Sequence, residues 1–259
     1  MSIAAIQIEA APNAARPRRK QRSEGDIGAL LAQLNGQLED LHPTEILRRT
    51  ITDHFAREIA LVSSFGAESA VLLHMAAAVD RDIPVIFLDT QMHFFQTIQY
   101  RDELVAGLGL ANVMSIEPDK ADLAREDPQN ILHKTSTDAC CDLRKVRPNA
   151  RALAPFGAWI TGRKRFQGGL RAKMDVVEYD GVHFKINPLA NWNAKQISHY
   201  FQIHDLPAHP LVAQNYPSIG CWPCTKAVAP GAEAGSRAGR WSGEEKSECG
   251  IHASYDPGI

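Results

Sequence analysis

The sequence predicts an α/β fold: a mostly parallel sheet with helices on both faces, followed by a mobile C-terminal tail. Three observations support this prediction. From about residue 59, short apolar runs of strand length alternate with stretches of helical periodicity. A polar loop separates each apolar run from the helical stretch after it, which is the order of a parallel α/β sheet. After about Pro230 the chain is rich in glycine and has almost no apolar periodicity.

The N-terminal part divides into an extension and two helices. Residues 1–24 mix alanine and proline with a basic run, and we expect a flexible extension. Their Arg-rich, acid-poor composition also resembles a transit peptide, which is the alternative. Apolar residues at helical spacing then predict an amphipathic helix through Ile27, Leu30, Leu31, Leu34 and Leu38. A second helix is expected over Thr44–Phe55.

The central part, residues 25–229, is predicted to form one α/β domain, and residues 230–259 form the tail. The expected strands are Ile59–Val62, Pro84–Leu88, Val113–Ile116 and Ala158–Thr161, and the expected helices between them are Ala70–Ala78 and Phe94–Val105. Such sheets bind ligands in the crevice beyond the carboxyl ends of their strands. That edge is expected to carry the loops Ser63–Ser69, Asp89–Gln91 and Thr161–Arg165.

The composition excludes several classes of protein. Lys and Arg number 28 and Asp and Glu 30, for a net charge of −2, so nucleic-acid binding through bulk electrostatics is not expected. No apolar run approaches the ~20 residues of a membrane-spanning helix, and the N-terminus lacks the apolar core of a secretory signal. Five cysteines, an odd number, argue against a disulfide framework and for metal-binding or catalytic thiols in the reducing cytoplasm.

The loop SSFGAES, residues 63–69, lies between a predicted strand and a predicted helix. Small residues with hydroxyl groups at a helix N-terminus expose backbone N–H groups and suit an anion such as phosphate. The loop lacks the Gly-Lys-Ser/Thr ending of a Walker A motif. A plain strand-to-helix turn with a serine cap is the alternative.

Four of the cysteines form two groups, Cys140–Cys141 and Cys221-Trp-Pro-Cys224. Two thiol pairs predict one four-thiolate site, for structural zinc or for a [4Fe–4S] cluster. Zinc sites usually space paired cysteines by two to four residues, whereas two adjacent thiolates can bind different irons of a cluster. The pattern therefore favours a cluster over zinc and over four unrelated buried cysteines.

Basic residues gather near these motifs. Arg144 and Lys145 follow the first cysteine pair, and the run Arg163-Lys164-Arg165 follows a predicted strand. Arg163 and Arg165 are expected at the crevice edge, where planar donors suit a polyanion, and Lys164 is expected to be solvated. Further along the chain stand Arg171, Arg237 and Arg240.

The fifth cysteine, Cys249, lies in the glycine-rich tail beside His252. A lone thiol near arginines has a lowered pKa and suits a nucleophile. An incidental terminal cysteine is the alternative interpretation.

Together these motifs resemble the assimilatory adenylylsulfate (APS) reductases, the iron–sulfur branch of the PAPS/APS reductase family, over roughly residues 45–253. The segments that carry the resemblance are SSFGAES at 63–69, FLDT at 87–90, CCDLRKV at 140–146, GCWPCT at 220–225, and GRW at 239–241 followed by KSECGIH at 246–252. Ile251 and Asn149 depart from the usual residues, and neither bears a chemical group of the reaction.

The resemblance implies a fold like the adenine-nucleotide α-hydrolases and a thioredoxin-dependent reduction of APS to sulfite and AMP, within sulfate assimilation and cysteine biosynthesis. It implies Cys249 as the nucleophile that becomes a thiosulfonate, and Cys140, Cys141, Cys221 and Cys224 as ligands of a [4Fe–4S] cluster. Thioredoxin or glutaredoxin is the implied reductant. The implied substrate-binding residues are Ser63, Ser64, Phe65, Gly66, Ser69, Asp89, Lys145, Arg163, Arg165, Arg171, Arg237, Arg240 and His252.

Alternatives remain open at this point. The substrate could be the 3′-phosphorylated nucleotide PAPS, or both nucleotides. More remote alternatives are an ATP pyrophosphatase-type thiolation enzyme, for which SGGxDS would be expected, and a zinc-binding module. Lys145 is hypothesised to link the cluster to the sulfate. Neither a nucleic acid nor a membrane is expected as a partner, and a homo-oligomer is compatible with the sequence.

Overall fold

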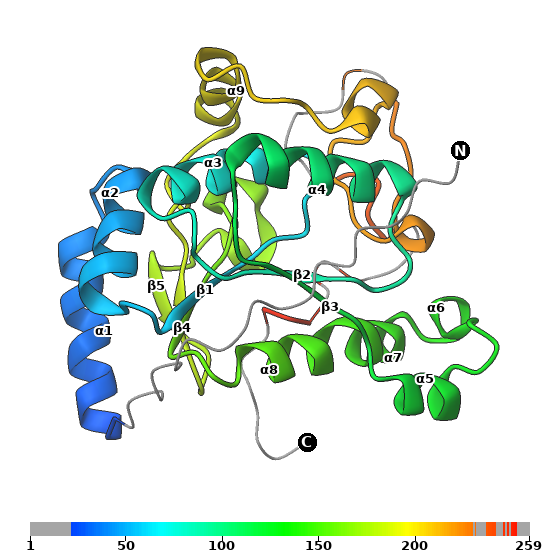
Figure 1. Ribbon diagram of the computed structural model, residues 1–259, viewed down its shortest axis with the longest axis horizontal. Coiled ribbons are helices and arrows are strands. Elements are labelled where there is room, and N and C mark those ends of the chain that lie inside the picture. The colour runs from blue at the N-terminus through cyan, green and yellow to red at the C-terminus, as the bar shows by residue number, and fades with distance from the viewer. Residues whose placement is uncertain are drawn as a thin grey trace.

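The computed structural model describes residues 22–229, 231, 237–241, 246, 248 and 250–252. A six-stranded sheet in the order β3-β2-β1-β4-β6-β5 runs through the centre (Figure 1). The strands are β1 Ile59–Val62, β2 Val85–Leu88, β3 Val113–Ile116, β4 Ala158–Ile160, β5 Val177–Tyr179 and β6 Phe184–Ile186. All neighbouring strands pair in parallel except β5, which is antiparallel to β6. The predicted mostly parallel α/β fold is confirmed.

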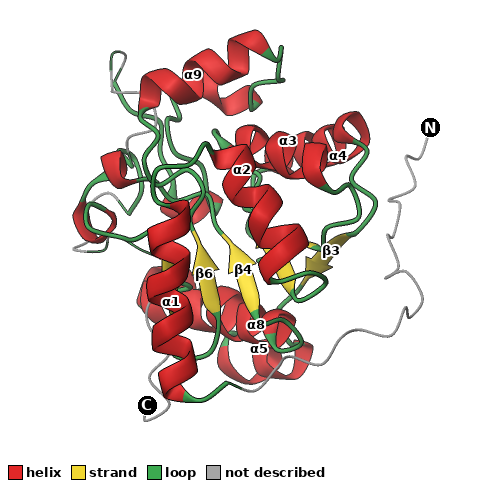
Figure 2. Ribbon diagram, turned by 90° about the vertical axis from the view of Figure 1, so that its left-hand side faces the viewer, coloured by secondary structure: helices red, strands yellow, loops and turns green. Residues whose placement is uncertain are grey.

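The helices form two layers with the sheet between them (Figure 2). Their bounds are α1 Glu24–Leu38, α2 Pro43–Arg48, α3 Ser69–Val79, α4 Phe95–Leu108, α5 Lys120–Glu126, α6 Leu132–Thr135, α7 Thr137–Cys141, α8 Arg147–Leu153 and α9 Ala194–Ile203. Alternate strand residues face the two layers. Leu61 packs in the large core with α1 to α4 and α9, whereas Ala60 packs with Trp159 and α8 on the other face.

The predicted elements agree closely with those observed. β1 and β3 have the predicted bounds, and β2 and β4 are each one residue shorter. β1, β2 and β4 are almost wholly buried, so their continuous apolar runs are visible in the sequence, whereas β3 is only partly buried. β5 and β6 were not predicted, because three residues are too short to show a strand periodicity.

α1 protects the outer edge of the sheet. The Asn35 side chain donates to Val177 O at 2.8 Å and accepts from Val177 N at 2.9 Å, so it satisfies the free backbone groups of β5. Ser23 caps α1 in a capping box with Asp26. Ser23 and Glu24, from the expected extension 1–24, therefore belong to this helix and its cap, and residues 1–21 lie outside the described residues.

Two helices widen to π-helical turns where their hydrogen-bond pattern is disturbed. The helix expected over Thr44–Phe55 is α2 followed by a π-helical segment over 49–54. Thr50 Oγ1 donates to Ile46 O at 2.7 Å within this stretch. A second π-helical segment, residues 142–146, joins α7 to α8 directly before Pro148, which has no N–H to donate.

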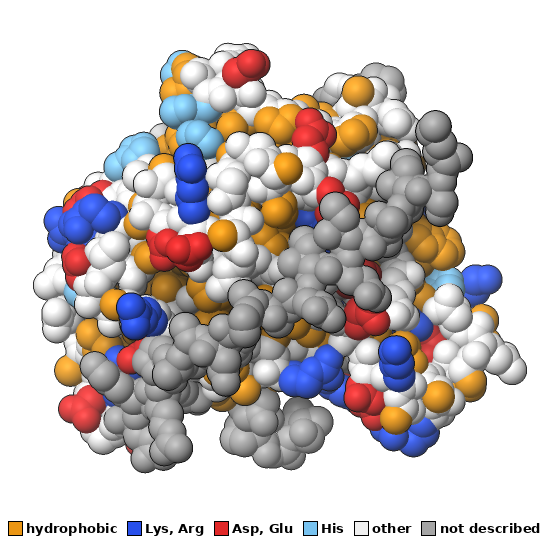
Figure 3. Space-filling view, in the orientation of Figure 1, with side chains coloured by type: hydrophobic (Ala, Val, Ile, Leu, Met, Phe, Trp, Pro, Cys, Tyr) orange, Lys and Arg blue, Asp and Glu red, His pale blue; other side chains and the backbone are white. Residues whose placement is uncertain are grey.

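The surface agrees with the near-neutral composition. On the face seen in Figure 3, acidic and basic side chains of the described residues are intermixed, without a continuous basic stripe. Within the described part of the chain, every helix is too short or too polar to cross a membrane.

Candidate active site

A cavity of about 210 Å³ opens beyond the carboxyl ends of β1 and β4, as the crevice argument predicted. Its walls come from two of the three predicted loops, those after β1 and β4, and from the tail, whereas the predicted loop Asp89–Gln91 does not line it. The predicted residues that line it are Ser63, Ser64, Gly66, Ser69, Lys145, Arg163, Arg171, Arg237, Arg240 and His252. Lys164, Cys221, Glu248 and Ile251 line it as well.

The conformation of the loop after β1 is fixed by a hydrogen bond within the loop and by a contact with the core. Ser63 Oγ accepts a hydrogen bond from Phe65 N at 3.1 Å, and Phe65 has a left-handed backbone with φ of 47°. Its ring is fully buried and packs edge-on against Phe87 at 5.6 Å. Phe65 therefore anchors the loop from the core and does not line the cavity. A Cβ at Gly66 would lie 3.1 Å from Ile219 O, so glycine permits this close approach.

Lys164 is buried, and the expectation that it is solvated is wrong. The side chain is 3% exposed, and Nζ lies 2.7 Å from Glu68 Oε2 and 3.0 Å from Gly162 O. Burial lowers the pKa of Lys164, and Glu68 opposes that change. Glu68 belongs to the loop SSFGAES, so this ion pair ties the loop after β1 to the loop after β4.

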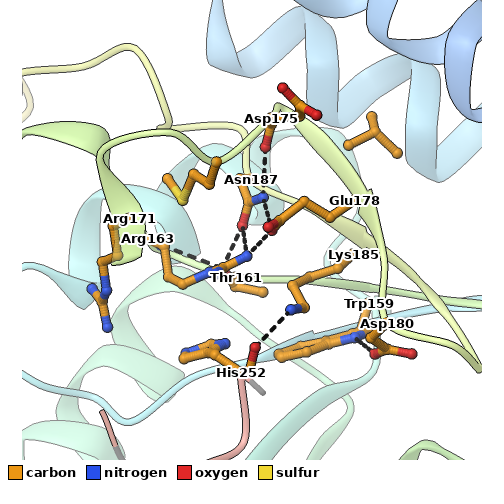
Figure 4. A network of polar contacts seen from close by, with 12 residues as sticks. Trp159, Thr161, Arg163, Arg171, Asp175, Glu178, Asp180, Lys185, Asn187 and His252 are labelled. Atoms are coloured by element: carbon orange, nitrogen blue, oxygen red, sulfur yellow. Dashed lines mark hydrogen bonds and ion pairs between the residues drawn. The ribbon is translucent and has the colours of Figure 1, made fainter. Parts of the chain in front are cut away.

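Arg163 is held in a polar network behind the cavity (Figure 4). Its guanidinium pairs with Glu178 and lies 3.1 Å from Asn187 Oδ1. Asn187 also accepts from Thr161 Oγ1 at 2.9 Å. Burial lowers the pKa of Arg163, and Glu178 opposes that change. The guanidinium therefore has a strong anionic partner of its own.

Arg171 and Arg237 instead bind a carboxylate of the tail. Arg171 Nε and Nη2 lie 2.5 and 2.9 Å from the two carboxylate oxygens of Glu248, and Arg237 Nη2 lies 3.5 Å from Oε2. Burial raises the pKa of Glu248, but the hydrogen bonds from Arg171 and the charges of Arg171, Arg237 and Arg163 together outweigh burial, and the net pKa is lowered. These arginines thus hold an oxyanion at the cavity wall.

Arg240 depends on a glycine of the GCWPCT segment. Its guanidinium stacks on Trp241 at 4.3 Å, and a Cβ at Gly220 would lie about 2.5 Å from the guanidinium. Only glycine at 220 leaves room for this arrangement. Among the described residues, the buried Arg240 Nε has no hydrogen-bond partner.

Two further predicted residues lie outside the cavity, as Phe65 does. Asp89 accepts from Gln91 N at 2.9 Å and so stabilises its own loop. Arg165 donates to Met174 O at 2.7 Å and pairs with Glu39 at 2.8 Å. Arg165 begins a short 3₁₀ helix, Arg165–Gln167, so its side chain does not follow the extended segment before it into the crevice.

The four cysteines of the predicted metal site lie near one another, beside the cavity. Cys140 and Cys221 pack together with Met92, all three buried, and Cys224 is partly exposed. Burial, followed by the charge of Cys141, raises the pKa of Cys140 to about 12. All four thiols are free of disulfides. No three His, Cys, Asp or Glu side chains in the described ranges converge closely enough to hold a single metal ion.

A buried ion pair that the sequence did not suggest fixes these cysteines. Arg144 Nη2 lies 2.8 Å from Asp127 Oδ2, and Nη1 donates to Thr90 O at 3.0 Å. Thr90 Oγ1 in turn lies 3.2 Å from Cys221 Sγ. Asp127 carries no sequence signal for this role, because the pair forms only when the π-helical segment 142–146 meets the loop before α6.

The described residues of the tail are packed, unlike the expected unpacked segment. Trp241 is 4% exposed, and its backbone N–H donates to Cys224 O at 3.1 Å. Ile251 packs with the apolar cluster around Trp159. The ring of His252 stacks on Trp159, with centroids 5.5 Å apart (Figure 4). Cys249 itself lies outside the described residues.

Comparison with known proteins places the chain in a family. Residues 58–227, more than half of the chain, match the model of the phosphoadenosine phosphosulfate reductase domain. The chain belongs to this family. An adenosine 5'-phosphosulfate reductase of Mesorhizobium japonicum is 53% identical over 90% of this chain and 91% of that protein. A phosphoadenosine 5'-phosphosulfate reductase of Gloeobacter violaceus is 40% identical over 86% of this chain and 93% of that protein.

Solved structures show the same fold. The phosphoadenylyl-sulfate (PAPS) reductase of Candida auris, in a phosphate complex, aligns with a TM-score of 0.66 and 26% identity over 81% of this chain and 99% of that one. Yeast FAD synthetase in complex with FAD aligns with a TM-score of 0.51 and 11% identity over 77% and 75% of the two chains, and this likeness concerns the fold alone. Both likenesses agree with the fold that the resemblance to the family implied.

Proposed function

We propose that the protein is an oxidoreductase that reduces adenylylsulfate to sulfite and AMP. One observation carries the proposal: Glu248 and Ile251, which flank Cys249 in the sequence, both line the cavity that holds Arg171, Arg240 and Lys145. The described residues before and after the thiol in the sequence therefore lie at a basic cavity, at the ligand-binding edge of the sheet. The sequences named as APS reductases, matched over most of the chain, support the same substrate.

The reaction has two half-reactions: Cys249 first takes the sulfur group from the nucleotide, and a dithiol reductant then releases it as sulfite. The Cys249 thiolate attacks the sulfur of the sulfate group, the bond between sulfur and the bridging oxygen breaks, and AMP leaves with the electron pair. A dithiol reductant of the thioredoxin or glutaredoxin class then attacks Cys249 Sγ, which releases sulfite and leaves a mixed disulfide. The second thiol of the reductant resolves this disulfide, so the reductant is oxidised and Cys249 is restored.

The basic residues at the cavity oppose charge repulsion in the first step. An anionic thiolate approaches a substrate that is already anionic, so cations near the sulfate lower the barrier. Arg171 and Arg237 already hold the Glu248 carboxylate, which shows that they can hold an oxyanion. The substrate's anionic groups take the same kind of contact.

Cys140, Cys141, Cys221 and Cys224 would hold a [4Fe–4S] cluster. The residues fit such a group, because the four thiols are grouped and form no disulfide, and two of them are adjacent in the chain. A bound cluster would supply a fixed charge distribution beside the cavity. Lys145, which lies close enough to influence the charge of Cys221 and Cys224, would lie between that charge and the substrate. Free thiols and a dithiol reductant fit a reducing compartment, so we propose the cytoplasm.

The alternative substrate is the 3′-phosphorylated nucleotide. The relative from Gloeobacter violaceus, which is 40% identical, is named for that substrate and supports this alternative. The ratio of kcat/KM for the two nucleotides decides between them. A higher kcat/KM for PAPS than for APS would replace the proposed substrate.

The proposed nucleophile is tested by Cys249→Ser, with Ser247→Ala on the same tail as the control. The wild-type protein, mixed with APS and no reductant, is expected to release about one AMP per active site and then stop. Mass spectrometry is expected to find one SO₃ adduct on the peptide that contains Cys249, removable by reduced thioredoxin. The Ser variant is expected to release no sulfite, and the control behaves as wild type. An adduct on another cysteine contradicts the assignment.

A further inference from the structure

A lysine outside the proposed machinery lies in the middle of a buried strand. Lys185 belongs to β6, and the strand register places it opposite Trp159 of β4 and Glu178 of β5. The residue is only 3% exposed. It shares the face of the sheet with Trp159 and α8, and it does not line the cavity.

Lys185 has no carboxylate partner at ion-pair distance among the described residues. Glu178 is engaged by Arg163 and Asn187. The carboxylate of Asp180 accepts from Trp159 Nε1 at 3.0 Å and from two backbone N–H groups of its own turn. Burial lowers the pKa of Lys185. An ammonium in such a place costs stability, because it has left water without gaining an ion pair.

The hydrogen bond of Lys185 goes to the tail. Nζ donates to the backbone carbonyl of His252 at 3.2 Å, and Figure 4 shows the two residues beside Trp159. Nζ also lies 5.5 Å from the centre of the Trp159 ring, on which His252 stacks. Lys185 therefore binds the backbone of His252, and Trp159 stacks on the His252 ring.

The tail is thus anchored on both sides of Cys249. On one side, Glu248 is bound by Arg171. On the other, Ile251 packs into the apolar cluster and His252 meets Lys185. The first anchor is made of substrate-binding arginines, which an anionic nucleotide competes for. The second anchor is independent of that competition.

We infer that Lys185 is a positioning residue: its ammonium holds the His252 carbonyl and so seats the tail segment that carries the nucleophile. This inference rests on the proposed role of Cys249. The physical argument is the cost of the buried charge. A methionine or leucine would fill this site with less desolvation, so the lysine at this position serves the tail and not the stability of the sheet.

The test compares Lys185→Met, which keeps the length and removes the charge, with Lys185→Arg, which keeps a donor. The matched control is Lys195→Met on the exposed side of α9. Each variant is made in the full chain, purified with its bound metal. Three quantities are measured: the single-turnover rate of AMP release, the hydrogen exchange of the peptide around residues 246–252, and the melting temperature.

Lys185→Met is expected to slow single-turnover AMP release about tenfold or more and to speed exchange in the tail, because a charge-assisted hydrogen bond is lost. Its melting temperature is expected to stay equal or rise. Lys185→Arg retains most of the rate, and Lys195→Met retains all of it. A slower rate of AMP release without a lower melting temperature indicates that Lys185 positions the tail.

Two outcomes overturn the inference. One is a wild-type rate and wild-type tail exchange in Lys185→Met. The other is a melting temperature that falls together with the rate, which is what a purely structural lysine would produce. The proposed function fails separately, because a wrong nucleophile leaves the wild-type protein without an adduct on Cys249, whereas tail exchange still reports on Lys185.

Discussion

Glu68 and Lys164 show how one buried pair shapes the site at the scale of single residues. The lysine side chain is 3% exposed and the carboxylate 17% exposed, and the two residues are 96 positions apart in the chain. Removal of one partner from such a pair leaves the other charge buried without compensation. The ion pair therefore holds the loops after β1 and β4 together, and neutralising either Glu68 or Lys164 alone destabilises the protein.

Glu68→Gln is accordingly expected to lower the free energy of unfolding by about 3 kcal/mol. Urea denaturation followed by circular dichroism measures this change. The double variant Glu68→Gln/Lys164→Met removes both charges and is expected to recover most of the loss. If the single variant is as stable as wild type, the pair does not hold the loops together.

At the scale of elements, His209 links the segment after α9 to α4. Its Nδ1 accepts from Leu211 N at 3.2 Å, and Nε2 lies 3.0 Å from Thr97 Oγ1. Nε2 therefore carries the proton of the neutral ring and donates to the threonine. Burial lowers the pKa of His209 to about 4. A second proton on the ring would sit on Nδ1, where it would face the N–H of Leu211, and the hydrogen bond from Leu211 would be lost.

The pH dependence of stability follows from that pKa. In the unfolded chain His209 has its ordinary pKa of 6.5 and binds a proton below that pH. In the folded protein the ring stays neutral down to about pH 4. This contribution to stability is full above pH 6.5 and is lost as the pH falls from about 6.5 to about 4, by about 2 kcal/mol. His209→Gln is expected to flatten this part of the profile, and His199→Gln on α9 is not. Parallel profiles for wild type and His209→Gln would contradict the linkage.

At the scale of the whole molecule, the cysteine site joins parts of the chain that are far apart in sequence. Cys140 and Cys141 end α7, whereas Cys221 and Cys224 lie about 80 residues later, in a segment that pairs with the tail. His93, after β2, forms an isolated bridge with Cys221. A metal group on the four thiols would therefore connect the sheet edge, α7 and the tail.

Removal of the metal group that we propose at the four thiols is expected to lower the melting temperature by about 10 °C. A chelator with a reductant strips the protein, and iron with sulfide, or zinc as the comparison, is then added back. Recovery of the melting temperature with iron and sulfide, together with a brown colour, supports the cluster. Recovery with zinc alone, in a colourless protein, would identify a zinc site instead.

The sequence by itself determined the alternation of strands and helices, and with it the fold class and the ligand-binding edge. The bounds of β1 and β3 were predicted to the residue. For β1 the reason is that a buried parallel strand is a continuous apolar run bounded by polar loops, whereas β3 is only partly buried and was indicated by three apolar residues of four. The grouping of the four cysteines was also predictable, since thiol pairs at two places have few other uses. These are local signals, carried by residue type and spacing.

Tertiary structure alone decided which basic residues serve the cavity and which serve the scaffold. Arg163, Lys164 and Arg165 are neighbours in one charged run, yet they pair with Glu178, Glu68 and Glu39 respectively. Lys185 finds its partner 67 residues away, in the tail. A side chain's partner depends on packing between distant elements, and a charge in the sequence does not reveal which element will face it.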